Sequence, residues 1–310
     1  MLKRTLLIVA FVGTSLLGLS QQRAITSTYQ YNMLMFNPAY AGSLNMLSVI
    51  GVHRAQWINQ PGAPETSVFS AHSSFVGDRV GVGIYGIRDK IGVHTDNALY
   101  ASYAYKIRTN FGILSLGLQG GFNSRESDFT QLELLDPNDP LLNQVVNRFV
   151  PNFGAGIYFA NPNLFAGFSV PYILENETLV VDEGLIGGST DSRESRLYYF
   201  TAGVIFPLTN SIKLSPSILV RGQEQNRLGW DITANVIFDD IAYVGVSGRN
   251  SGEITFLGQL ILNENFRVGY AYDAVTSDQN QFNAGTHEIL LNYRIKLRLN
   301  SDDPLCPVYY

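Results

Sequence analysis

The stretch HEILLNYRIKLR, from His287 to Arg298, decides the fold of this chain. From Ile289 onward every second position is apolar, and the positions between are polar or charged, with Leu290 as the exception. A period of two predicts a β-strand, because successive side chains of a strand point to opposite faces. Apolar residues on one face and charges on the other are typical of a strand with lipid outside and water inside.

The same alternation recurs upstream, most clearly in residues 228–238, where Trp230 and Ile232 lie on one face and Asp231 and Thr233 on the other. The whole pattern predicts fourteen strands, and most reach the roughly 9–11 residues that a tilted membrane strand needs. The expected strands are 46–56, 66–76, 79–88, 96–107, 111–122, 150–160, 163–171, 196–206, 211–221, 228–238, 241–249, 253–262, 265–272 and 286–298.

The connections between these strands alternate in length between short and long. The short ones contain Gly, Pro, Asn or Asp, which suit tight turns, and they lie at 77–78, 109–110, 161–162, 207–210, 239–240 and 263–264. The long ones lie at 57–65, 89–95, 123–149, 172–195, 222–227 and 273–285, and 250–252 is a short exception on their side. We therefore predict an all-β fold: a transmembrane antiparallel up-and-down β-barrel of about fourteen strands, with short periplasmic turns and longer extracellular loops. An even strand count would put both chain ends in the periplasm.

The composition agrees with a barrel. Charged residues make up 15% of the chain, against roughly 25% in ordinary soluble domains, and no apolar run after the N-terminus reaches the roughly 18 residues of a spanning helix. A soluble β-sandwich or a secreted repeat protein would also show alternation. The regular swap of short and long connections favours the barrel.

The chain opens with Lys3 and Arg4, an apolar stretch and small residues before Gln21, which is the pattern of a secretory signal. A membrane anchor helix is the alternative, but the apolar run is short for one. We expect a signal peptide at 1–20, an N-terminal periplasmic or plug segment at 21–45, the barrel at 46–298 and a tail at 299–310. The expected location is the outer membrane of a Gram-negative bacterium.

Charge and cysteine content exclude several functions. Without Lys3 and Arg4, the chain has 19 basic and 26 acidic residues, a net charge of −7. Nucleic acid is therefore not an expected partner, since phosphate contacts need Lys and Arg. Cys306 is the single cysteine, which excludes an internal disulfide and a Cys-cluster metal site.

The motifs that carry chemistry elsewhere lack their context here. The sequence GVGIYG at 81–86 matches a dinucleotide pattern but lies within a predicted strand instead of before a helix. His287-Glu288 begins like a zinc-protease motif, yet the second His is missing. The acidic loops 123–149 and 172–195 offer oxygen ligands for Ca²⁺ but no EF-hand spacing, so solvated surface charge is the preferred interpretation. We expect no enzyme, no cofactor and no metal.

The most distinctive residues lie around the first strand. In Asn37-Pro38-Ala39-Tyr40-Ala41-Gly42, Pro38 fixes φ and Gly42 permits a sharp turn. This segment either plugs or braces the periplasmic mouth, or it is a docking surface for a periplasmic partner. The residues that follow are Arg54, Gln56, Trp57, Gly62, Ala63, Pro64 and Thr66, and Trp57 fits an interfacial aromatic girdle.

In these residues the chain resembles the PorP/SprF family of Bacteroidetes outer-membrane proteins. The resemblance continues through residues 103–106 and 151–156, then Gly269–Asp273 and Gly285–Ile289, while Asn280-Gln281 carries no family signature. It implies partner-binding or structural roles for twelve residues: Asn37, Pro38, Ala39, Tyr40, Gly42, Arg54, Gln56, Trp57, Pro64, Asp273, His287 and Glu288.

The resemblance implies a non-enzymatic accessory role in type IX secretion, sometimes linked to gliding motility. The expected partners are outer-membrane lipid, translocon components and a large secreted or surface adhesin, whose export or attachment the barrel supports by binding it. Loops 123–149 and 172–195 would face this cargo, and segment 21–45 would face periplasmic components. The alternative is a passive channel for small solutes, which inward polar residues such as Lys106 and Asp231 would suit.

Overall fold

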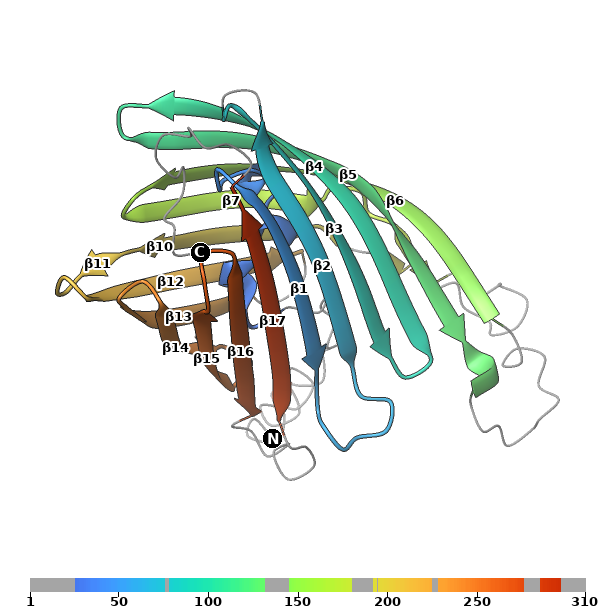
Figure 1. Ribbon diagram of the computed structural model, residues 1–310. Coiled ribbons are helices and arrows are strands. Elements are labelled where there is room, and N and C mark those ends of the chain that lie inside the picture. The colour runs from blue at the N-terminus through green and yellow to red at the C-terminus, as the bar shows by residue number, and fades with distance from the viewer. Residues whose placement is uncertain are drawn as a thin grey trace, which may run out of the picture.

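The computed structural model is a closed antiparallel barrel of fourteen strands (Figure 1), and it describes residues 26–75, 78–131, 145–179, 192–193, 195–224, 228–275 and 285–296. Each strand pairs with its sequence neighbour, and the pairing of β1 with β17 closes the ring. The strands are β1 (Leu47–Ala55), β2 (Glu65–Phe75), β3 (Val80–Ile91), β4 (His94–Thr109), β5 (Gly112–Asp128), β6 (Val145–Asn161), β7 (Leu164–Tyr172), β10 (Leu197–Val204), β12 (Ile212–Gln223), β13 (Gly229–Phe238), β14 (Ala242–Arg249), β15 (Glu253–Ile261), β16 (Phe266–Val275) and β17 (Thr286–Ile295).

Minor elements complete the described structure. The short strand β11 (Phe206–Pro207) pairs with the start of β12, and β8 (Glu177–Leu179) pairs with β9 (Ser192–Arg193) as a separate ladder. Four short 3₁₀ turns are η1 (Tyr29–Tyr31), η2 (Met33–Met35), η3 (Pro38–Tyr40) and η4 (Phe129–Gln131). No helix within the described ranges is long and apolar enough to span a membrane.

The predicted barrel and its fourteen strands are confirmed, but some connections were predicted wrongly. Residues 89–95 are not a long loop, because β3 and β4 continue to a tight turn at Gly92 and Val93. In the predicted loop 123–149, β5 continues to Asp128 and β6 begins at Val145. These strand ends lack the apolar alternation that lipid imposes on the rest of the barrel, so the pattern did not reveal them.

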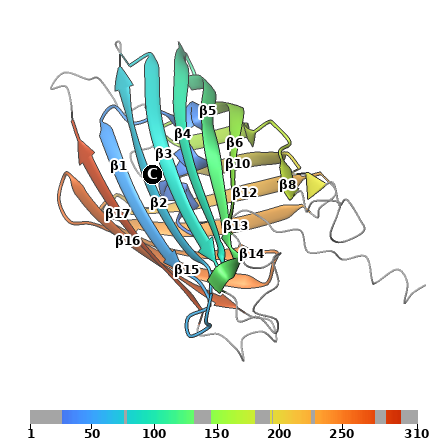
Figure 2. The same ribbon diagram turned by 90° about the vertical axis from the view of Figure 1, so that its right-hand side faces the viewer.

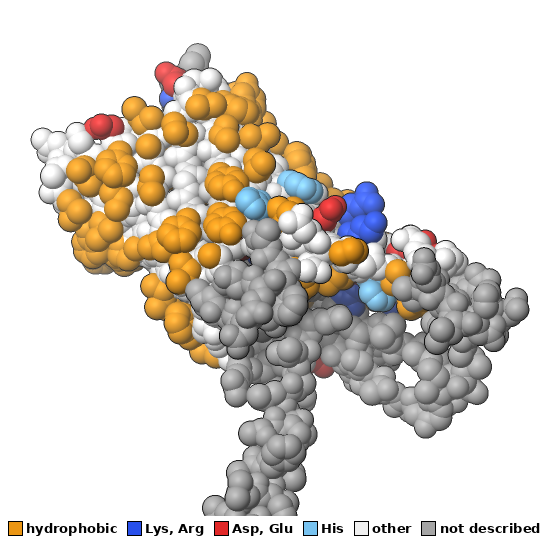
Figure 3. Space-filling model, turned by 90° about the horizontal axis from the view of Figure 1, so that it is seen from below, with side chains coloured by type: hydrophobic (Ala, Val, Ile, Leu, Met, Phe, Trp, Pro, Cys, Tyr) orange, Lys and Arg blue, Asp and Glu red, His pale blue; other side chains and the backbone are white. Residues whose placement is uncertain are grey.

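The outer wall is apolar, whereas the inner wall carries both polar and aromatic or aliphatic side chains. On β4 the exposed side chains include Leu99, Tyr103 and Ile107, whereas Ser102 and Lys106 on the inner face are buried. Figure 3 shows hydrophobic side chains gathered over the outer wall of the face in view. This division is what a strand between lipid and a filled interior requires.

The two ends of the barrel differ. Turns at residues 110–111, 162–163 and 239–241 form the short-turn end, where Asp239 and Asp240 have positive φ values of 48° and 56°. The opposite, long-loop end includes residues 56–64, which connect β1 and β2. Because short turns are periplasmic in outer-membrane barrels, we assign the long-loop end to the cell exterior.

Candidate functional site

The barrel interior is occupied by the chain's own residues 26–44, which we call the internal segment. Figures 1 and 2 both show its 3₁₀ turns inside the ring of strands. Its residues are buried, with Leu34 at 0% and Tyr40 at 1% relative exposure. Aromatic rings of the segment pack edge-on against the inner wall, as between Phe36 and Tyr199, whose centroids are 5.3 Å apart. The lumen is therefore packed like a protein core.

At the long-loop end, the internal segment is held by a cluster that we call the Ser27 anchor: Ser27, Thr28, Arg54, Asp273 and Glu288. The backbone N–H groups of Ser27 and Thr28 donate to the two Glu288 oxygens at 2.7 and 2.9 Å. The Ser27 hydroxyl lies 2.8 Å from both Asp273 oxygens. Arg54 Nη1 joins the two carboxylates, at 2.7 Å from Asp273 and 3.1 Å from Glu288.

The electrostatics of the Ser27 anchor depend on the internal segment. All five side chains are buried, and one guanidinium faces two carboxylates. The remaining negative charge is met by the donors of Ser27 and Thr28, together with the hydroxyl of Thr255, which donates to Asp273 at 2.7 Å. Because a buried charge without partners is strongly destabilising, the segment and the wall hold one another in place.

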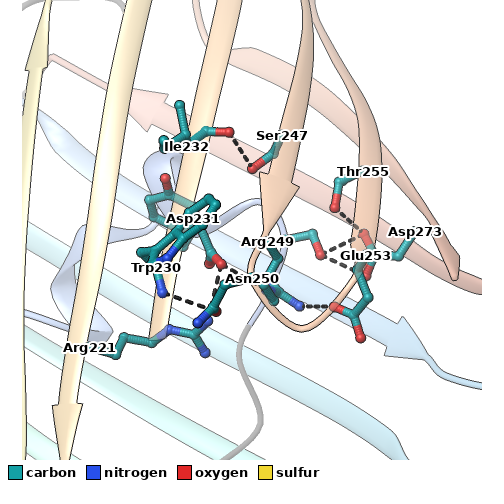
Figure 4. A network of polar contacts seen from close by, with 12 residues as sticks. Arg221, Trp230, Asp231, Ile232, Ser247, Arg249, Asn250, Glu253, Thr255 and Asp273 are labelled. Carbon is teal, nitrogen blue, oxygen red and sulfur yellow. Dashed lines mark hydrogen bonds and ion pairs between the residues drawn. The ribbon is translucent and has the colours of Figure 1, made fainter. Parts of the chain in front are cut away.

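Neighbouring strands continue this charged band around the long-loop end (Figure 4). Asp231 on β13 accepts from Arg221 on β12 at 3.0 Å and from Arg249 on β14 at 2.9 Å. Arg249 also pairs with Glu253 on β15. Asp231 is an inward polar residue, as predicted from the sequence, but this network was not predicted. The sequence does contain a signal for this network: charged residues occupy inward positions near the long-loop ends of strands β12 to β15.

In the middle of the barrel, Asn37 fixes η3 against β6. Its side-chain oxygen accepts from Ala39 N–H at 3.0 Å, which caps the turn, and its amide donates to the Ile157 carbonyl at 2.9 Å. Pro38 occupies the first position of the turn, where its lack of an N–H is harmless. Opposite, a Cβ added at Gly117 would lie 2.1 Å from Ala39 N. This local fit explains the distinctive Asn37–Gly42 sequence.

Near the short-turn end, Gly42 turns the chain out of the lumen towards β1. Its φ of +64° is a left-handed conformation that glycine adopts without strain. Its N–H donates to His72 Nδ1 at 3.2 Å, and Lys106 Nζ donates to its carbonyl. A Cβ added at Gly81 would lie 1.9 Å from the Ala41 carbonyl oxygen. In the GVGIYG stretch, Gly81 therefore makes room for the internal segment.

Residues 18–293 match the family described as "Type IX secretion system membrane protein PorP/SprF". The chain belongs to the PorP/SprF family. It is therefore an outer-membrane component of type IX secretion in a Gram-negative bacterium. No curated protein matches the chain.

Solved structures similar to this PorP/SprF chain include an outer membrane protein, a transporter and a porin, all of low sequence identity. The outer membrane protein Omp33 of Acinetobacter baumannii is 10% identical, with a TM-score of 0.46 over 82% of this chain and 99% of that one. The toluene transporter TbuX of Ralstonia pickettii is 9% identical, with a TM-score of 0.47 over 84% and 92% of the two chains. The KdgM porin is 9% identical, with a TM-score of 0.35 over 79% and 98%.

The structure of this PorP/SprF chain brings together only some of the twelve residues named from the sequence. Arg54, Asp273 and Glu288 meet in the Ser27 anchor, although they come from three strands. Asn37 to Gly42 lie deep in the lumen. The others lie near the long-loop end: Gln56 donates its N–H to Pro64, Trp57 is exposed, and His287 contacts the Tyr270 hydroxyl at 2.6 Å outside the barrel.

The course of the internal segment distinguishes between the two interpretations that the sequence left open for residues 21–45, a plug and a docking surface. Ser27 lies at the long-loop end and Gly42 near the short-turn end, so residues 26–44 run through the barrel instead of facing periplasmic components. Asn37 to Gly42 are buried and form no docking surface in this structure. The physical reason is the hydrophobic effect. The apolar side chains of residues 26–44 are removed from water when the segment lies inside the lumen. Residues 21–25 lie outside the described ranges.

The expectations about metal ions concern mainly residues outside the described ranges. The acidic positions Glu133, Asp136 and Asp139 fall in 132–144, and those of 180–191 are likewise not described. Within the ranges that the structure describes, no group of three or more His, Cys, Asp or Glu side chains is arranged to hold a metal ion.

Proposed function

We propose that this PorP/SprF barrel is a non-enzymatic accessory of type IX secretion that supports export or surface attachment of a partner protein by binding it at the long-loop end. Family membership supports the secretion context. The observation that carries partner binding is the length of β5 and β6, which continue past the end of the apolar outer face of β5. Each has 17 residues, well above the roughly 9–11 that cross a membrane.

The outward side chains of β5 show where the belt ends. Leu114, Leu116 and Leu118 give way, after Phe122, to Ser124, Glu126 and Asp128. The neighbouring β4 changes in the same register, because Leu99 lies opposite Phe122 and Asn97 opposite Ser124. Strands beyond this level stand in water. These strand ends extend the barrel on one side at the long-loop end, where an exported protein would arrive.

The alternative, a passive solute channel, has no support from the interior. A diffusion pore needs a wet lumen, whereas the internal segment places buried side chains such as Leu34 and Tyr31 across it. Both ends of the segment are tied to the wall by buried polar contacts. Partner binding is therefore the function that this architecture supports best.

The experiment is a deletion of the whole chain in its own bacterium, followed by quantification of proteins on the cell surface. We expect at least one surface protein to be lost from the cell surface and restored by complementation. Purification of the tagged barrel from solubilised outer membranes, with mass spectrometry, then identifies the bound chain. An unchanged set of exported and attached proteins after deletion would contradict the proposal.

A further inference from the structure

Within the described residues, the first part of β6 has no strand paired to one of its two edges. On one side it pairs with β5 along its whole length, from Val145 opposite Asp128 to Ala160 opposite Ile113. On the other side β7 pairs with it only from Ala155 onward. Figure 1 shows β5 and β6 continuing beyond the end of β7. Among the described strands, the beginning of β6 is therefore an edge.

The hydrogen-bonding direction of this edge follows from one contact. Ile173 N–H donates to the Phe153 carbonyl at 2.8 Å, so the backbone groups of Phe153 point towards β7. Because these groups alternate sides along an antiparallel strand, those of Pro151, Phe149 and Asn147 point the same way. Pro151 has no N–H, and its carbonyl accepts from the Asn176 side chain at 3.3 Å. Beyond it, the backbone of Phe149 and Asn147 has no partner on that side within the described part of the chain.

The side chains beside the open edge are apolar and exposed. Phe149 is 62% exposed and Val145 is 55% exposed, and the residue opposite Phe149 on β5 is Ser124, which lies beyond the last apolar outward side chain of that strand. The Phe149 ring packs on Phe122, with centroids 4.6 Å apart, which holds it in place. Natural edge strands in water are usually protected by lysine, bulges or short length. Among the described residues of this edge, Val145–Phe149 contains no lysine and no register shift, and its one charged residue, Arg148, lies on the opposite face from Phe149. The edge is therefore open to pairing with another strand.

We propose that the edge of β6 at Val145–Phe149 binds an extended segment of the exported partner protein as an added β-strand. The partner's backbone pairs with Phe149 and Asn147, and its apolar side chains at alternate positions pack on Phe149 and Val145. The proposal rests on the proposed function and specifies how the partner is recognised. A second copy fits less well: two copies in one membrane have β6 running in the same direction, so only the weaker parallel pairing is available to them.

The test compares two substitutions at one edge position. Asn147→Pro removes the N–H that points to the open side, and leaves the pairing with β5 intact because that N–H does not take part in it. Asn147→Ala is the matched control, since it loses the same side chain, including its contact with Ser124, but keeps the N–H. We expect about tenfold less partner protein to co-purify with the Asn147→Pro barrel than with the control.

A photo-crosslinking amino acid at position 147 provides the second measurement, with no change to the backbone. Crosslinks to the exported partner support the proposal. Crosslinks to a second copy, or to residues 132–144 or 180–191 of the same chain, overturn it. Equal partner recovery with Asn147→Pro and Asn147→Ala would contradict strand addition at the β6 edge and leave the proposed function intact. A deletion strain with unchanged surface proteins would instead refute the proposed function itself.

Discussion

Glycines on the inner wall determine how closely the internal segment can approach the strands. At Gly81, Gly117 and Gly156, an added Cβ would lie between 1.9 and 2.1 Å from atoms of residues 37–41. Two of these three contacts are with backbone atoms, which cannot rotate away. The wall and the segment are therefore fitted to one another at the level of single carbon atoms.

We predict that Gly117→Ala destabilises the barrel, because the new methyl group overlaps the backbone of Ala39. The free energy of unfolding should fall by about 1–3 kcal/mol, the usual effect of overpacking. Denaturant titration of the detergent-solubilised protein measures it. Gly51→Ala is the control, since nothing lies within 4 Å of its added Cβ. Equal stability of the two variants would show that the internal segment is not packed at Gly117.

A second prediction concerns the Ser27 anchor. Glu288→Ala leaves the backbone N–H groups of Ser27 and Thr28 without an acceptor, while Arg54 keeps its ion pair with Asp273. Unfolding should therefore become easier by about 1–3 kcal/mol for each unsatisfied N–H group. The neighbouring His287→Ala is the control, because that side chain lies outside the barrel beside Tyr270. Limited proteolysis adds a specific readout: we expect faster cleavage within residues 26–44 of the Glu288→Ala protein only. Protection equal to the control would contradict the anchoring role.

The composition of the Ser27 anchor was only partly predictable from the sequence. Arg54, Asp273 and Glu288 were named through the family resemblance, and no periodicity placed them together. Their partner Ser27 was not named, because two small polar residues before an apolar stretch give no recognisable signal. Buried inward charges such as Arg221 and Asp231 are similarly hard to assign, since a wet lumen and a filled one need the same polar positions on the strands.

At the scale of elements, contact with lipid determines which strand segments can be predicted from the sequence. Where a strand lies between lipid and a polar interior, as β17 does, alternation identifies it. Where strands rise into water, as in residues 123–128 of β5, both faces are polar and the same segment resembles a loop. The 3₁₀ turns of the internal segment have no period long enough to detect, so their path through the barrel was not predictable.

The assignment of the two barrel ends gives a prediction about exposed connections. In a background without Cys306, Pro61→Cys places a thiol in the exposed connection between β1 and β2, and Phe111→Cys places one in a short turn where Phe111 is 84% exposed. We expect a membrane-impermeant maleimide to label position 61 on intact cells, and position 111 only after permeabilisation of the outer membrane. The reverse result would invert the barrel and place Ser27 at the periplasmic end.

At the scale of the whole molecule, the barrel uses its first described residues as its core. An empty barrel of fourteen strands would need water to fill its lumen, but here aromatic and aliphatic side chains of residues 26–44 occupy it. The outer surface is left for lipid, and in the proposed function the long-loop end is left for a partner protein. This division of surfaces is what separates a filled secretion-associated barrel from a diffusion pore.

We therefore predict that the full-length protein shows no stable conductance in planar bilayers, because the internal segment blocks the path of ions. Deletion of residues 26–44 should produce discrete open-channel steps, since it removes the side chains that fill the lumen and leaves inner-wall charges such as Lys106 and Arg294 facing water. Heat-dependent mobility on gels verifies that the deleted barrel still folds. If that barrel does not fold, Glu288→Ala supplies the comparison, with brief openings expected as the segment detaches at one end. Stable conductance of the unmodified protein, equal to that of the variants, would show that residues 26–44 do not close the lumen in the membrane.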